Sequence, residues 1–234
     1  MPGTEHRRTL LTLGDMEVVG RMPNSSNATL LVNVTLGDDA TQAIYKPGKG
    51  ERPLWDFPPG LYRREVAAYE LSRALGWDQV PCTVLRDGQY GEGSVQLFVE
   101  FDPQQHYFTI HEERPDLHRD LRRMAVFDII ANNTDRKGGH VLLGGDGSVW
   151  GIDHGVCFSD DFKLRTVIWE FAGEDICADD IAAVEPLAQR IPAEVAEMLT
   201  DSEIDAMYGH IEWVLTNRVF PSPGSRYEYP WPIL

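Results

Sequence analysis

The sequence predicts an α+β protein with two lobes. The first lobe, residues 1–101, is expected to be mainly an antiparallel sheet with one helix, and the second, residues 102–234, to be mainly helical. Short β-branched and aliphatic stretches separated by turn residues dominate the first hundred positions. Apolar residues at helical spacing dominate the remainder. The strand pattern ends near residues 100–103, which places the boundary between the lobes there.

Three strands are expected at the start of the chain. Residues 10–19 and 28–36 are rich in Leu, Val and Thr, and the turn-rich residues 20–27 connect them. A third strand over residues 40–46 ends at Pro47, because proline cannot donate a ladder hydrogen bond. These strands form the first half of the expected sheet.

The first helix is expected over residues 63–75. Its apolar residues recur at helical spacing and form one core-facing stripe: Ala67, Leu71, Ala74 and Leu75. Gly76 suits the left-handed conformation that often follows a helix. Two further strands, residues 80–85 and 94–101, complete the sheet.

The second lobe is expected to begin with a helix that Asp116 caps and that continues to about residue 131. A polar loop over residues 132–139 follows it. Two short strands, residues 140–143 and 149–153, then flank a glycine-rich turn. This arrangement places polar residues between an apolar helix and a hairpin.

The C-terminal part carries one strong helix signal and one extended segment. Thr200 and Glu203 have the spacing of a capping box and precede an apolar helical pattern. Residues 221–234 are rich in proline and aromatic residues, so we expect an extended tail packed on the surface.

The net charge excludes some classes of function. The chain has 37 acidic and 21 basic residues, a formal charge of −16. Such a chain is repelled by nucleic acids and by anionic membranes, so we expect neither as a stable partner. The three cysteines are too scattered for a disulfide framework or zinc site. With no export signal or apolar span, the expected location is the cytoplasm.

The first lobe contains residues suited to binding phosphates. Lys46 ends an apolar strand, and a buried lysine needs an anionic partner. Glu65, in the following helix, supplies a carboxylate for it. The turn at residues 24–27 contains small residues whose backbone N–H groups can approach phosphates.

The second lobe contains residues suited to phosphoryl transfer. Asp135 lies in the polar loop, where it can accept a proton from an acceptor hydroxyl, and His140 follows five residues later. Asp153 ends a strand before His154 and Gly155, as a metal-binding aspartate does in protein kinases.

Each of these features has an ordinary structural explanation. Lys46 is compatible with a lysine whose amine reaches solvent, Glu65 with a solvated helix residue, and Asp135 with a loop cap. The order of the features along the chain favours phosphoryl transfer, because independent turns would not follow this order.

Five stretches carry a family resemblance: residues 44–47 (IYKP), 64–69 (REVAAY), 93–100 (GSVQLFVE), 128–136 (DIIANNTDR) and 152–155 (IDHG). Together they resemble the phosphatidylinositol 3- and 4-kinase superfamily. The sequence is most similar to the type II phosphatidylinositol 4-kinases and their small bacterial relatives. The resemblance extends over about residues 25–173 and implies a two-lobed protein-kinase-like fold that uses ATP.

The resemblance also implies a set of ATP-binding residues. Serines of the first turn would cover the phosphates, a lysine–glutamate pair would bind them, and three residues of the hinge would surround adenine. In this sequence those residues are Ser25, Ser26, Lys46, Glu65, Gln96, Phe98 and Val99.

For the chemical step, the resemblance implies Asp135 as the catalytic aspartate and Asp153 as the main metal ligand. His140 stands where the family usually has asparagine, as a second ligand. Imidazole suits Mn²⁺ better than Mg²⁺, so we expect either Mg²⁺ or Mn²⁺. The cysteine-rich stretch that is palmitoylated in the family is absent from the sequence, which leaves membrane attachment unsupported.

The sequence leaves three functions open. The leading hypothesis is an active ATP-dependent kinase whose acceptor is a small molecule, a protein or a lipid. The second is a pseudokinase, a nucleotide-binding scaffold inactivated by His140. The third is a toxin-type protein kinase resembling the HipA group.

Overall fold

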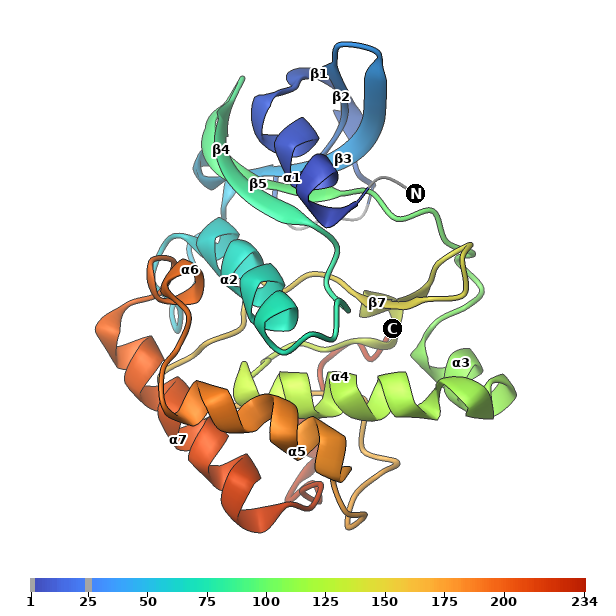
Figure 1. Cartoon of the computed structure of the whole chain (residues 1–234), viewed down its shortest axis with the longest axis vertical. Helices are drawn as coiled ribbons and strands as arrows, with labels where there is room; N and C mark the ends of the chain where they lie inside the picture. Colours follow the sequence, from blue (N-terminus) through green and yellow to red (C-terminus); the bar gives the residue numbers. More distant parts are fainter. Residues whose placement is uncertain (1–2, 24–26) are drawn as a thin grey trace.

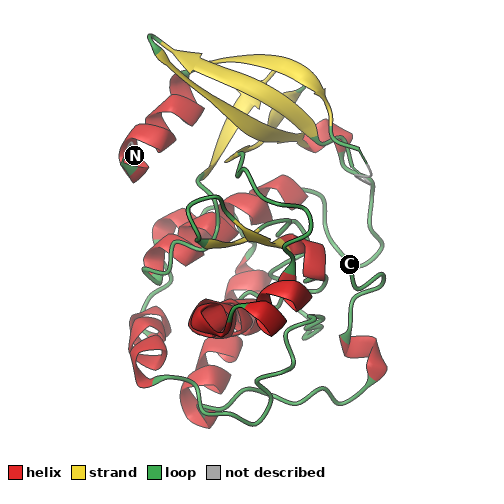
Figure 2. Ribbon diagram, turned by 90° about the vertical axis from the view of Figure 1, so that its right-hand side faces the viewer, coloured by secondary structure: helices red, strands yellow, loops and turns green. Residues whose placement is uncertain are grey.

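The computed structural model describes residues 3–23 and 27–234. It has an α+β fold in which a five-stranded sheet lies above a mostly helical part (Figure 2). The expected fold class is therefore confirmed. Among the described residues, no helix is both long and apolar enough to span a membrane.

The sheet of the first lobe is antiparallel throughout, with the order β1-β2-β3-β5-β4. Its strands are β1 (Asp15–Arg21), β2 (Leu30–Leu36), β3 (Asp39–Pro47), β4 (Thr83–Gly88) and β5 (Gly91–Leu97). Strand β3 is central, so its residues are paired on both sides.

Two helices accompany the sheet, and one of them differs from the sequence prediction. Helix α1 (Thr4–Leu13) includes residues 10–13, which were expected to be strand. Leu10 and Leu11 are buried against the sheet, and Arg86 donates hydrogen bonds to the carbonyls of Leu11 (2.7 Å) and Gly14 (2.9 Å). Packing and these bonds to the helix end stabilise a helix where the composition favoured a strand.

Helix α2 (Leu61–Ala74) lies below the sheet (Figure 1) and is the helix expected from the apolar stripe. Gly76 follows it with a φ of +67°, as predicted. Strand β4 begins at Thr83 and not at residue 80 as expected, because Pro81 cannot donate a hydrogen bond to the neighbouring strand. Strand β5 ends at Leu97, so residues 98–101 leave the sheet and lead into the second lobe.

The second lobe is built around the buried helix α4 (Figure 1). Its helices are α3 (Tyr107–Glu113), α4 (His118–Ile130), α5 (Ala178–Val184), α6 (Ala193–Ala196) and α7 (Asp201–Asn217). The sequence predicted α4 and α7 but not the three shorter helices. The α4 segment begins with a 3-10 turn over Pro115–Leu117, so Asp116 lies inside that turn instead of capping the helix.

A two-stranded hairpin and an extended tail complete the lobe. Strands β6 (Val141–Leu143) and β7 (Val149–Gly151) pair as predicted, except that β7 ends before Asp153. Thr200 accepts a hydrogen bond from the Glu203 N–H, and Glu203 accepts one from the Thr200 N–H, so the capping box is confirmed. The tail, residues 221–234, contains no α-helix or strand, and near its end the Ile233 carbonyl accepts a hydrogen bond from the Gly138 N–H at 2.8 Å.

Candidate active site

Three charged side chains from separate elements meet between the lobes. Lys46 lies near the end of β3, Glu65 lies in α2, and Asp153 follows β7. The Lys46 ammonium contacts the Glu65 carboxylate and lies 2.9 Å from Oδ1 of Asp153. The Lys46 ammonium therefore links strand β3 and helix α2 of the first lobe to the second lobe.

The charges in this cluster reinforce one another. Burial favours the neutral amine of Lys46, but the carboxylates of Asp153 and Glu65 outweigh it and raise the pKa of Lys46. In turn, the Lys46 ammonium lowers the pKa of Asp153 far below its usual range. Asp153 is therefore ionised, and its side chain remains 53 % exposed, so it is available to a ligand.

Asp135 lies in the loop that follows α4. Its Oδ2 is 2.9 Å from the Lys137 ammonium, and its backbone N–H donates to Oδ1 of Asn133 at 3.0 Å. Burial raises the pKa of Asp135, while Lys137 acts in the opposite direction. A raised pKa makes the carboxylate a better proton acceptor.

A buried ion pair fixes this loop. Arg136 and Asp128 are both fully buried, and Nη2 of Arg136 lies 2.9 Å from Oδ1 of Asp128. Asn133 also donates to Asp128, at 2.9 Å. On its other side Arg136 donates to the Ile152 carbonyl at 3.0 Å. One guanidinium therefore connects the loop of Asp135 to the residue before Asp153.

His154 connects the same network to the first lobe. Its Nε2 lies 2.8 Å from Nη2 of Arg136, and its backbone N–H donates to Oε2 of Glu65 at 3.1 Å. Burial, assisted by Arg136, lowers the pKa of His154 well below its usual value. The ring is therefore neutral, and Nε2 accepts the hydrogen bond.

The sequence analysis did not assign roles to Asp128, Arg136 or the His154 side chain. One signal was available: Asp128 interrupts the apolar run of residues 126–130. A buried carboxylate in such a run requires a partner. The sequence does not reveal which of the basic residues pairs with it.

The two expected metal ligands lie side by side. Nε2 of His140 is 3.4 Å from Oδ2 of Asp153, and its Nδ1 accepts the Lys137 N–H at 3.4 Å. Burial lowers the pKa of His140, which keeps the ring neutral. The described residues contain no cluster of three or more potential protein ligands. Two ligands suit Mg²⁺ or Mn²⁺ held partly by phosphate oxygens and water, as in nucleotide sites.

The expected hinge residues lie where the sheet leads into the second lobe. Gln96 is opposite Ile44 in the register, so it shares a face of the sheet with Lys46. Its amide donates to Oγ1 of Thr83 at 2.9 Å, and the Phe98 N–H donates to the Gln42 carbonyl at 3.0 Å. The Gln96 amide and the Phe98 N–H therefore already have hydrogen-bond partners within the protein. Val99 lies beyond the end of β5. Ser25 and Ser26 fall outside the described residues.

The fold and the charged cluster define a protein of the kinase-like class. The family model "Phosphatidylinositol 3- and 4-kinase" matches residues 83–208. Protein Rv2133c of Mycobacterium tuberculosis is 40 % identical, covering 97 % of this chain and 95 % of that protein. The chain belongs to the phosphatidylinositol 3- and 4-kinase family, which confirms the resemblance seen in the sequence.

One more distant relative shares part of the sequence, and two solved structures share the fold. The rice phosphatidylinositol 4-kinase gamma 4 is 28 % identical over 65 % of this chain, which spans 28 % of that protein's length. The Helicobacter pylori proinflammatory kinase CtkA has a TM-score of 0.54 at 12 % identity, covering 90 % of this chain and 94 % of that one. The Golgi casein kinase with Mn/ADP bound has a TM-score of 0.58 at 14 % identity, covering 99 % and 80 %.

Proposed function

We propose that the protein is an ATP-dependent phosphotransferase that transfers the γ-phosphate to a hydroxyl group. The observation that carries this proposal is the contact of Lys46 with both Glu65 and Asp153. This contact brings a cation suited to phosphate binding and a carboxylate suited to metal binding together from opposite lobes. Family membership supports the same chemistry.

Lys46 would bind the phosphates of ATP, with Glu65 holding its ammonium in place. Gln96, Phe98 and Val99 would lie near adenine, and Ser25 and Ser26 over the phosphates. Asp153 and His140 would hold Mg²⁺ or Mn²⁺. The metal supplies positive charge that offsets the charge developing on the phosphate oxygens.

Asp135 would act on the acceptor. As the hydroxyl oxygen bonds to the terminal phosphorus, its proton passes to the Asp135 carboxylate, and the bond to the leaving ADP breaks. The raised pKa of Asp135 favours this transfer. Arg136 does not react; its bonds to Asp128 and Ile152 would hold Asp135 and Asp153 in register.

One observation favours a pseudokinase as the second candidate. The family usually has asparagine where this chain has His140, and Nε2 of this imidazole already faces Asp153. If this contact persists with nucleotide bound, the second metal position is lost.

Hydrolysis of ATP separates the two candidates, because water can replace the acceptor. We expect phosphate release with Mg²⁺ or Mn²⁺, abolition by EDTA, and a drop of about 100-fold or more in Asp135→Asn. Release no faster than the uncatalysed rate in both the wild type and Asp135→Asn would favour the pseudokinase. Binding of ATP without any release would favour it as well.

A further inference from the structure

A cavity of about 500 Å³ adjoins the proposed catalytic aspartate. Asp135 lines it on one side, and Arg165 lies in the segment that pairs with the same loop. The tail provides the remaining lining, including Arg226, Tyr229 and Trp231. The volume is that of a small-molecule site. A phosphate acceptor must lie beside the base, so this cavity is placed to hold it.

Backbone hydrogen bonds fix the two sides of the cavity. The Gly138 N–H donates to the Ile233 carbonyl at 2.8 Å, and the Thr166 N–H donates to the Glu228 carbonyl at 3.1 Å. Arg165 is bound to the loop in turn, because its N–H donates to the Asn133 carbonyl at 2.8 Å. The tail is thus attached to the structure on both sides of Asp135, and the cavity exists before a ligand binds.

The cavity contains two unpaired positive charges. Although the protein is acidic overall, most of its arginine side chains pair with carboxylates. Arg122, for example, lies 2.6 Å from Glu174. Among residues 3–23 and 27–234, neither Arg165 nor Arg226 has an ion-pair partner. Arg165 uses Nε to donate to the Tyr227 carbonyl at 3.1 Å, and no described residue accepts from its terminal nitrogens. Guanidinium groups bind phosphate and carboxylate through paired hydrogen bonds.

We infer that the acceptor is a small, water-soluble alcohol that carries a phosphate or carboxylate group. Its anionic group binds Arg165 and Arg226, and its hydroxyl lies at Asp135. The inference rests on the proposed function. The hydroxyl O–H bond breaks, its proton passes to Asp135, the new O–P bond forms, and ADP leaves. The attached tail favours a compact acceptor over a membrane lipid or a folded protein.

The test uses the full chain, ATP labelled on the γ-phosphate, and an extract of cells that express the protein. The extract is divided into protein, lipid and small-molecule fractions, and the last is separated on an anion-exchange resin before the reaction. We expect the labelled product to form from the retained, anionic small molecules. Arg226→Gln should raise the KM for that fraction about 10- to 100-fold while leaving ATP affinity unchanged.

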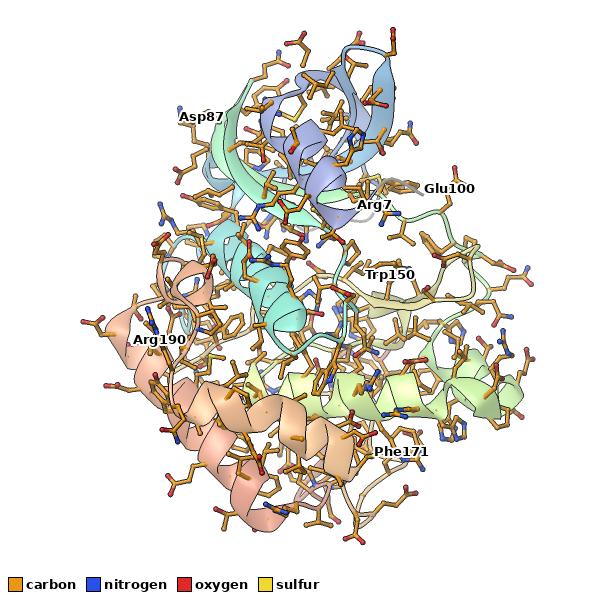
Figure 3. All side chains as sticks on the ribbon, viewed as in Figure 1. Arg7, Asp87, Glu100, Trp150, Phe171 and Arg190 are labelled. Carbon is orange, nitrogen blue, oxygen red and sulfur yellow. The ribbon has the colours of Figure 1, made fainter. Side chains whose placement is uncertain are left out.

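Arg190→Gln is the matched control, because Arg190 also has no ion pair among the described residues and lies near α6 (Figure 3). It should behave as the wild type, and Arg226→Lys should recover part of the loss. Label appearing in the lipid, protein or unretained fraction would overturn the inference while leaving the proposed function intact. An unchanged KM in Arg226→Gln would do the same. Failure of every fraction to show transfer that depends on Asp135 would overturn both.

Discussion

Arg136 is the residue on which most of the proposed active site depends. It is fully buried, pairs with Asp128, and donates hydrogen bonds to Nε2 of His154 and to the Ile152 carbonyl. A buried ion pair contributes little net stability, but removing one partner leaves an unpaired charge. The position is therefore sensitive to substitution although it touches no substrate.

We expect Arg136→Met to lower the free energy of unfolding by about 3–5 kcal/mol, measured by urea denaturation. The double variant Asp128→Leu/Arg136→Met should recover part of this loss, because it removes both charges. Arg119→Met is the control: its partner Asp179 is exposed, and such pairs contribute about 0–1 kcal/mol. Equal losses in Arg136→Met and Arg119→Met would show that the buried pair has no special role.

The sequence identified those candidate site residues that have a chemical reason to stand out, and their roles stay predictions. Lys46 ends an apolar strand and Asp153 comes before His154 and Gly155, and the structure brings both together with Glu65. The supporting residues could not be predicted, because their roles depend on tertiary contacts. Arg136 and His154 are eighteen residues apart, and their hydrogen bond exists only in the fold.

At the scale of elements, strong periodic patterns were reliable and weak ones were not. Helix α2 and the capping box of α7 were predicted, because each has a clear local signal. Helix α1 was missed because its leucines and threonines also suit a strand, and only packing on the sheet decides between the two. Helices α5 and α6 are too short to show a helical period.

The packing of α7 on α4 predicts a pH effect on stability. His210 in α7 is partly buried beside Phe162, and burial lowers its pKa although its bond with the Ile130 backbone opposes this. In the unfolded chain His210 has its ordinary pKa of about 6.5 and therefore binds a proton more readily than in the folded protein. The free energy of unfolding falls as the pH drops below that value.

We expect His210→Gln to reduce the loss of stability between pH 7.5 and pH 5.5, measured by urea denaturation at both values. His6→Gln, at an exposed position in α1 beside Asp39, serves as the comparison for losing a histidine from the surface. If His210→Gln shows the full wild-type loss, another group is responsible for the acid sensitivity.

At the scale of the whole molecule, charge is distributed unevenly. The chain has a formal charge of −16, yet Arg165 and Arg226 line the same cavity as Asp135. The average field would repel large anionic surfaces, whereas a small anion can reach two local guanidinium groups. This combination favours a small ligand over a membrane.

The membrane prediction follows directly. We expect the protein to stay in the supernatant when vesicles rich in phosphatidylserine are sedimented at physiological salt. Salt screens charges beyond about 8 Å, but a protein bound at the vesicle surface lies within that distance and is repelled. Neutral phosphatidylcholine vesicles provide the control. Sedimentation with the anionic vesicles alone would contradict this prediction and would favour a lipid acceptor.

The central claim is that one residue holds the donor and another acts on the acceptor. The most direct test measures ATP affinity by calorimetry and phosphate release for Asp135→Asn and Lys46→Ala. Asp135→Asn should bind ATP within a few fold of the wild type while release falls by about 100-fold or more. Lys46→Ala should weaken ATP binding by about 10-fold or more, because a charged contact with the phosphates is lost. Full phosphate release by Asp135→Asn, or unchanged ATP affinity in Lys46→Ala, would contradict this assignment of roles.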